Sequence, residues 1–169
     1  MDIIKSHMIK YKKLPENRWK AYKELRLVAI KKDWISFGVA YEDEADYSKK
    51  EWQQKMNHTV FALDGEDIVG LIAYDFATLF KMRHVAYIND LYVDQAHRRI
   101  GLGSRLLKEV IKEIKKNPKI EKIKLIADPT QVGAIKLYKK FGFKKIALIK
   151  KDLKYKGKYY NDFHMEKWL

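Results

Sequence analysis

Two arginines, two glycines and a serine gather in the segment HRRIGLGSRLL, residues 97–107, directly ahead of an apolar helical pattern. Glycines let a backbone approach a ligand closely, and the free N–H groups at the start of a helix attract anions. The segment therefore predicts an anion-binding loop. Which anion it holds is open at this point, because a dinucleotide, a nucleoside triphosphate and a coenzyme tail would each imply a different enzyme.

The spacing of the glycines excludes two of these ligands. A dinucleotide-binding loop reads G-x-G-x-x-G early in a βαβ unit, but Leu106 stands where the third glycine is needed. A nucleoside-triphosphate loop ends in G-K-[ST], and no Lys-Ser or Lys-Thr follows the glycines here. What remains is the pattern R-x-x-G-x-G, formed by Arg98, Gly101 and Gly103 after a strand and at the start of a helix.

Hydrophobic periodicity predicts the elements that position this loop. Apolar stripes of helical period indicate helices over 16–31, 101–116 and 130–141, and a capping box of Ser48 and Glu51 begins a shorter helix over 48–56. We expect strands over 8–14, 87–93, 122–128, 143–150 and 159–167, and a hairpin with an Asp64-Gly65 turn over 58–78. The order βααβββαβαββ predicts one α/β (α+β) domain over residues 1–169, with a mixed, mostly antiparallel central sheet flanked by helices.

Composition narrows the class of protein. Hydrophobic residues make up 47% of the chain, so a packed core is expected. Cysteine is absent, which excludes disulfides, thiolate metal sites and a covalent cysteine intermediate. The histidines show no ligand spacing, so no metal site is expected. The chain has no apolar run of membrane-spanning length, and its start lacks the apolar core of a secretion signal, so we expect a cytoplasmic protein.

The positive charge is unevenly placed. The net charge is +14, and residues 101–169 alone carry 19 basic and 7 acidic side chains. This distribution has two interpretations: a solvated lysine-rich surface, or a field that attracts a polyphosphate ligand or a nucleic acid.

With the loop and its flanking elements in place, the sequence resembles the GNAT superfamily of N-acetyltransferases. That family's first signature, [RQ]-x-x-G-x-[GA] after the fourth strand, matches the segment YINDLYVDQAHRRIGLG, residues 87–103. Its second signature, N-x-x-A-x-x-L-Y-x-x-x-G-F, is similar to QVGAIKLYKKFGF, residues 131–143, where Gln131 replaces the asparagine. Residues 25–52 also look like the acceptor-side helices of bacterial members, and 157–169 like their closing strand. The resemblance thus covers essentially the whole chain.

The resemblance implies an enzyme that uses acetyl-CoA, without a metal, to acetylate a primary amine directly in a ternary complex. The strand backbone at Leu91, Tyr92 and Val93 would pair with the pantetheine arm of the coenzyme. The pyrophosphate would lie on the amides from Arg98 or Arg99 through Ser104. The remaining coenzyme contacts implied by the resemblance are Ile100, Gly101, Leu102, Gly103, Gln131, Ala134 and Tyr138.

The resemblance also implies catalytic roles. Tyr138 matches the position that commonly protonates the departing thiolate, although its place on the apolar face with Ala134 and Leu137 equally fits a core aromatic. Several members carry a glutamate base where Asn89 stands here. The neighbouring Asp90 is our candidate base, and strand alternation predicts that its side chain and that of Asn89 point to opposite faces. The acidic stretch Glu42–Asp46 and a chain of waters are the alternatives.

The acceptor is the most open question. Candidate acceptor-side residues are Asp33, Phe37, Tyr41, Glu42 and Asn89. The acidic segment has two interpretations: it attracts a polyamine or another small cationic amine, or it is a solvated acidic loop. Protein N-termini, lysines and an antibiotic amine stay open as acceptors, so the substrate is a small-molecule or a peptide amine. The departures at Asn89 and Gln131 keep open a degenerate coenzyme-binding sensor. A basic nucleic-acid-binding module, with Tyr155, Tyr159 and Tyr160 among lysines, leaves the paired motifs unexplained. We therefore expect no nucleic-acid or membrane partner, while a homodimer is common in such enzymes.

Overall fold

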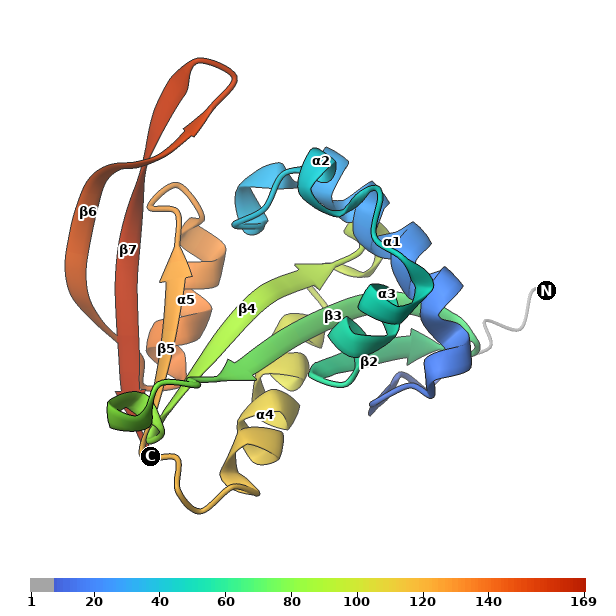
Figure 1. Cartoon of the computed structure of the whole chain (residues 1–169), viewed down its shortest axis with the longest axis horizontal. Helices are drawn as coiled ribbons and strands as arrows, with labels where there is room; N and C mark the ends of the chain where they lie inside the picture. Colours follow the sequence, from blue (N-terminus) through green and yellow to red (C-terminus); the bar gives the residue numbers. More distant parts are fainter. Residues whose placement is uncertain (1–7) are drawn as a thin grey trace.

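The computed structural model describes residues 8–169 and arranges them around one seven-stranded sheet (Figure 1). Residues 1–7 of the expected domain lie outside the described part. The strand order is β1-β2-β3-β4-β5-β7-β6, and every neighbouring pair is antiparallel except β4 and β5. This confirms the predicted mixed, mostly antiparallel sheet. The strands are β1 (Lys10–Lys12), β2 (Thr59–Asp64), β3 (Asp67–Phe76), β4 (Val85–Val93), β5 (Lys122–Ala127), β6 (Lys144–Tyr155) and β7 (Lys158–Trp168).

The helices agree with the predicted ones and include one more. The α-helices are α1 (Trp19–Lys32), α2 (Tyr41–Glu44), α3 (Lys49–Met56), α4 (Leu102–Lys115) and α5 (Val132–Lys140), joined by the short 3-10 turns η1 (Glu16–Arg18), η2 (Trp34–Ser36), η3 (Phe80–Met82) and η4 (Gln95–His97). The capping box of α3 is confirmed, because the Ser48 amide donates to the Glu51 carboxylate at 2.6 Å. No helix among residues 8–169 is long and apolar enough to cross a membrane.

Helix α2 corrects the predicted order, which had no helix between 33 and 47. With α2 the order becomes βαααβββαβαββ. A helix of four residues is too short to show a helical period, so the sequence contains no apolar stripe that would predict α2. The Asp43 carboxylate accepts a hydrogen bond of 2.7 Å from the Ala40 amide and so caps the start of the helix.

Two hydrophobic clusters lie on opposite faces of the sheet. Helices α4 and α5 cover one face, and α1 and α3 cover the other. The predicted stripe of α4 is fully buried on its face at Leu106, Leu107, Val110 and Ile114. Burying each such side chain contributes roughly 1.5–3 kcal/mol. The sheet is therefore a rigid layer between two sets of helices, and its strand ends can hold a site in place.

The sheet opens between its two parallel strands. β4 and β5 pair only over Val85–Tyr87 and Lys122–Lys124. Beyond those residues the strands diverge, as Figure 1 shows. The second half of β4 therefore has one edge without a strand partner, and its backbone N–H and C=O groups there are available to a ligand.

A β-bulge lies in this open half of β4. Leu71 of β3 pairs with Tyr92 and Ala73 pairs with Asn89, so that Asp90 and Leu91 together face Ile72. Asp90 takes a positive φ of 54°. Our prediction that Asn89 and Asp90 point to opposite faces is therefore wrong, because an extra residue breaks the alternation. Both side chains lie on the side covered by α1 and α3.

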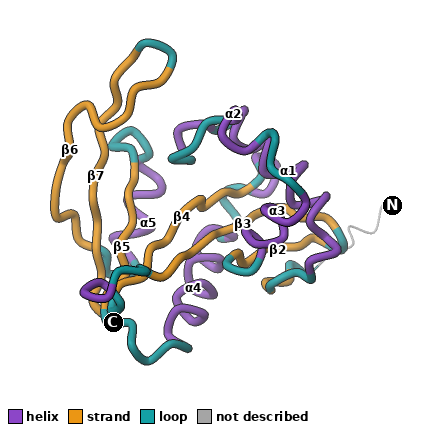
Figure 2. The backbone as a smooth tube through the Cα atoms, viewed as in Figure 1, coloured by secondary structure: helices purple, strands orange, loops and turns teal. Residues whose placement is uncertain are grey.

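Strands β6 and β7 form a long hairpin whose far end projects beyond β5 (Figure 2). The turn holds Gly157 at a φ of 77°. The hairpin reaches η2, because the ring of Trp34 lies 4.9 Å from that of Tyr155 and 5.0 Å from that of Tyr160, measured between centroids. Segments more than 120 residues apart in the chain thus meet above the open end of the sheet.

Candidate active site

The glycine loop has the geometry of an anion site. Gly101 adopts a φ of 89°, in the left-handed region, and α4 begins at the next residue. The amides of Leu102, Gly103 and Ser104 therefore stand in the first turn, where a helix offers them no acceptor. Arg99 is exposed beside them. The loop thus presents N–H groups and positive charge together, as an anionic ligand requires.

Gly103 leaves room that the protein itself does not need. A methyl group at this position would lie 3.6 Å from Leu137 and 3.9 Å from Val93, which are ordinary van der Waals distances. Packing within the protein therefore does not require glycine at position 103. Close approach of a ligand to the backbone is the remaining physical reason for it.

The side chain of Arg98 is partly exposed and is tied back to the chain by two hydrogen bonds. Its Nε donates to the carbonyl of Val93 at 2.9 Å, and one terminal nitrogen donates to the Asp33 carboxylate at 2.9 Å. Asp33, a predicted acceptor-side residue, thus lies at the loop, where it joins the end of α1 to the end of β4. Arg98 positions the amides, and exposed Ile100 and buried Leu102 flank the turn.

A cavity of about 270 Å³ lies where β4 and β5 diverge. It brings together Tyr138, Asp90, Asn89, Leu91, Gln131 and Phe37 from the predicted set. Phe37 and Asn89 are the predicted acceptor-side residues among its lining. Tyr41 lies instead beneath the Lys31 ammonium, 3.7 Å from its ring centroid, and Glu42 is exposed on α2. Tyr92 packs into the core on the α1 side, and Ala134 packs on the α4 and α5 side.

Tyr138 reaches this cavity from α5 and is otherwise buried, with 7% of its surface exposed. Burial, and secondarily the negative charge of Asp90, raises the pKa of the phenol above its ordinary value. Tyr138 is therefore protonated throughout the neutral range. It can donate a hydrogen bond or a proton to a group in the cavity.

Asp90 belongs to a buried ion network. Arg26 of α1 is fully buried and donates to Asp90 at 3.0 Å and to buried Glu44 at 2.8 Å. Lys55 lies 3.0 Å from the same Glu44 carboxylate. Burial alone would raise the pKa of Glu44, but the hydrogen bonds and charges of Arg26 and Lys55 hold it below its ordinary value. The network fixes the Asp90 carboxylate against Arg26.

Polar contacts span the cavity. Gln131 donates to the Ser36 hydroxyl at 2.6 Å and so ties the start of α5 to η2. Asn89 donates to Asp75 on the neighbouring strand at 3.1 Å. The amide side chain that replaces the family's usual asparagine thus bridges two elements in this structure.

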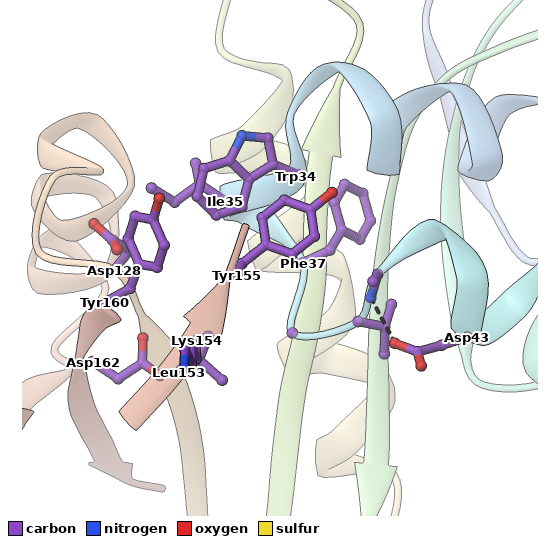
Figure 3. Close-up of a pocket in the computed structure, with 13 residues that line it drawn as sticks. Trp34, Ile35, Phe37, Asp43, Asp128, Leu153, Lys154, Tyr155, Tyr160 and Asp162 are labelled. Atoms are coloured by element: carbon purple, nitrogen blue, oxygen red, sulfur yellow. Dashed lines mark hydrogen bonds between the residues drawn. The ribbon is translucent and has the colours of Figure 1, made fainter. Parts of the chain in front are cut away.

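Sequence reasoning missed three carboxylates of the cavity lining, those of Asp128, Asp152 and Asp162. They come from the end of β5, from β6 and from β7, so no local motif joins them. A second hollow, shown in Figure 3, shares Asp128 and Asp162 with the cavity and adds the rings of Trp34, Tyr155 and Tyr160. Tyr155 and Tyr160 were noted in the sequence among lysines, but their proximity to Trp34 depends on the hairpin.

Known proteins with similar sequence or structure point to one family. The sequence model of the Acetyltransferase (GNAT) family matches residues 27–143. The L-amino acid N-acetyltransferase AaaT of Escherichia coli (strain K12) is 28% identical over 120 residues, which cover 68% of this chain and 73% of that protein. An N-alpha-acetyltransferase of Sulfurisphaera tokodaii is 36% identical over 73 residues, 43% of this chain and 42% of that protein.

The fold agrees with these sequence matches. The crystal structure of a GNAT-family acetyltransferase from Streptococcus pneumoniae superposes with a TM-score of 0.84 at 17% identity, covering 96% of this chain and 100% of that one. The family match spans more than half of the present chain and includes the glycine loop and Tyr138. This chain therefore belongs to the GNAT family of acetyltransferases, whose co-substrate is acetyl-CoA.

Proposed function

We propose that this acetyltransferase moves an acetyl group directly from acetyl-CoA to a primary amine bound in the cavity between β4 and β5. One observation carries the proposal: the unpaired end of β4 lines the same cavity as the Tyr138 phenol and leads directly into the anion-binding loop. A ligand lying along β4 with its anionic end on the loop would place its other end beside Tyr138.

The residues present fit this co-substrate. Bound acetyl-CoA supplies an acetyl thioester, and the backbone at Leu91, Tyr92 and Val93 would pair with its pantetheine arm like an added strand. The amides from Arg99 through Ser104 would hold the pyrophosphate, and the Ser104 hydroxyl adds a donor. The open space at Gly103 supports this placement, because a side chain there would stand between ligand and backbone.

Tyr138 is the proposed proton donor. Transfer forms a C–N bond and breaks a C–S bond, so the departing sulfur must gain a proton. The buried, protonated phenol at the cavity wall can supply it. The chain contains no cysteine, so no thiol can carry the acetyl group as an intermediate, and this absence supports direct transfer in a ternary complex.

The proposed acceptor is a small cationic amine. In the acidic segment that first suggested a cationic acceptor, Glu44 pairs with Arg26 and Asp43 caps α2, so these two carboxylates already have partners within the protein. The carboxylates of Asp128, Asp152 and Asp162 at the cavity now support the same class of acceptor. Free amino acids and peptide N-termini are the natural comparisons, since the relatives are named as L-amino acid and N-alpha-acetyltransferases.

The test is release of free CoA from acetyl-CoA across a panel of spermidine, cadaverine, L-amino acids and short peptides, with thermal denaturation in parallel. We expect acetyl-CoA to raise the Tm and at least one amine to release CoA. No shift of Tm at millimolar acetyl-CoA would refute the assignment of the loop. A protein that binds acetyl-CoA but releases no CoA with any amine would be a sensor and not an enzyme.

A further inference from the structure

We propose that Asp162, on β7, is the group that receives the proton of the acceptor amine, and that the amine therefore enters the cavity as an ammonium ion. This inference rests on the proposed function and assigns the base that the sequence left open. It moves the base from β4 to the opposite wall of the cavity.

Position is the first argument. Asp162 is 5% exposed and lines both the reaction cavity, with Tyr138, and the aromatic hollow, with Trp34. The two hollows share six lining residues: Ile35, Phe37, Gly38, Asp128, Leu153 and Asp162. An amine passing from the aromatic hollow to the thioester would therefore pass Asp162. Figure 3 shows its carboxylate together with the rings that surround this approach.

The Asp162 carboxyl lacks a compensating cationic donor in the part of the chain that the structure describes. Among the hydrogen bonds and ion pairs of residues 8–169, none gives the Asp162 carboxylate an N–H donor or a lysine or arginine partner. The neighbouring Asp128 is satisfied differently, because it accepts from the amide and the hydroxyl of Thr130 at 2.7 and 2.5 Å. The Asp162 carboxyl makes its side-chain hydrogen bond with another acid, Asp152, which brings no positive charge, and an arriving ammonium ion would supply that missing charge.

Several other titratable groups lie around Asp162. Asp152 on β6 and Asp128 after β5 are negative, while His164 on β7 lies 3.9 Å from Asp152. Lys154, on the wall of the aromatic hollow, holds its ammonium 5.2 Å from the ring centroid of Tyr159. The remaining titratable groups of the lining are Asp43 on α2, Asp90, Tyr138, Tyr155 and Tyr160. Burial, followed by the charges of Asp152 and Asp128, raises the pKa of Asp162, and a raised pKa favours uptake of a proton.

Aromatic rings support the same class of ligand. Trp34 lies in contact distance of both Tyr155 and Tyr160, so the approach to Asp162 is walled by ring faces and edges. Ammonium ions are attracted to such faces. The carboxylates and rings together describe a site for an alkylammonium group rather than for an anion.

Asp90, the other candidate, is less suited to the role. Its carboxylate accepts from Arg26, which is fully buried. Protonating Asp90 would remove part of the charge that stabilises this guanidinium. Asp90 is therefore a positioning residue that holds the bulge, whereas Asp162, within the described residues, has no guanidinium partner that depends on its charge.

The proton balance is simple. One N–H bond of the ammonium breaks and an O–H bond forms on Asp162, which leaves a neutral amine with a lone pair for the acetyl carbon. The second proton that the nitrogen loses on becoming an amide replaces the one that Tyr138 gives to sulfur. Asp162 then returns its proton to solvent, so the enzyme ends in its starting state.

The experiment compares Asp162→Asn with wild type, with Asp162→Glu as the conservative variant and Asp67→Asn as a control. Asp67 is an exposed carboxylate at the start of β3. We expect Asp162→Asn to lower kcat/KM with the best amine of the panel by about 10²- to 10³-fold and to remove the acidic limb of the pH profile. Asp162→Glu should recover part of both, and Asp67→Asn should change neither. Binding of spermidine to the CoA complex, measured calorimetrically, should weaken about tenfold in Asp162→Asn while acetyl-CoA binding is unchanged.

Two outcomes would overturn the inference. One is an Asp162→Asn enzyme that keeps the acidic limb of the pH profile and the spermidine affinity of the wild type, in an assay in which the wild type acetylates amines. That result would contradict the role of Asp162 and would leave the proposed function unaffected. The other is an equal loss in Asp67→Asn, which would assign the effect to general surface charge. If wild type releases no CoA with any amine, the proposed function itself fails, and the inference fails with it.

Discussion

Replacing Glu44 by glutamine tests the buried network beneath the β4 bulge. Glu44 and Arg26 are both fully buried, and the carboxylate also lies 3.0 Å from the ammonium of Lys55. Glutamine keeps the shape of the side chain but removes its charge, so Arg26 would retain Asp90 as its one anionic partner. We expect a large loss of stability from a substitution of only one atom.

The magnitude follows from the burial of the pair. Breaking a buried ion pair by neutralising one partner typically costs about 3–5 kcal/mol. Because Asp90 still faces Arg26 at 3.0 Å, we expect the lower end, about 3 kcal/mol. In a chain of 169 residues, each kcal/mol lowers the Tm by roughly 2–4 °C, so the Tm should fall by about 6–12 °C.

The same variant makes a prediction about pH. The folded pKa of Glu44 is lowered, so its contribution to stability is present above the unfolded pKa and is lost as the pH falls through the folded pKa. The difference in unfolding free energy between wild type and Glu44→Gln should therefore be full at pH 7 and shrink below about pH 4.

Denaturation followed by circular dichroism at pH 7 and pH 3.5 measures both effects, with Glu42→Gln as the control. Glu42 is exposed on the same short helix, and its substitution should change stability by less than about 0.5 kcal/mol. If Glu44→Gln were as stable as Glu42→Gln at pH 7, the assignment of a stabilising buried network would be refuted.

Two further substitutions test the loop and the aromatic hollow. Gly101→Ala should destabilise the protein by about 1–2 kcal/mol, because the φ of 89° at this position is unfavourable for alanine, and it should weaken acetyl-CoA binding in calorimetry. The control is Gly133→Ala, in the open first turn of α5, which should stabilise the protein slightly. Equal changes of stability in the two variants would contradict a special role of the Gly101 backbone. Trp34→Ala should raise the KM for the amine about tenfold, since ring contacts are worth about 1–2 kcal/mol, and should leave the Kd of acetyl-CoA unchanged. The control is Trp168→Ala, at the distal end of β7. A matching rise of the KM in Trp168→Ala would contradict a local role of Trp34.

Features encoded in short stretches of sequence were predictable. The glycine loop, the Ser48 capping box and the apolar stripe of α4 each lie within one segment, and each is found where expected. Tyr138 could be placed because it belongs to the same motif as Phe143, on which its ring packs at 6.0 Å between centroids. The loop, the capping box and the stripe depended on local spacing, whereas the role of Tyr138 depended on the resemblance to the family.

Features created by pairing between distant segments were not predictable. The orientation of Asp90 depends on a bulge that only the register with β3 reveals. Asp162 reaches Asp128 because Phe163 pairs with Ala127 across β7 and β5, which no spacing along the chain encodes. Arg26 did carry a signal, since a charged residue within the apolar stripe of a helix must find a buried partner, but the sequence does not say which acid that is.

The most direct test of the account is the turnover of Tyr138→Phe, measured as CoA release with the best amine, beside its Kd for acetyl-CoA. The substitution removes one hydroxyl and keeps the ring. If Tyr138 protonates the leaving sulfur, kcat should fall by about 100-fold or more while the Kd stays within about threefold of wild type. An unchanged kcat, or a loss of activity that follows a matching loss of acetyl-CoA binding, would contradict the account.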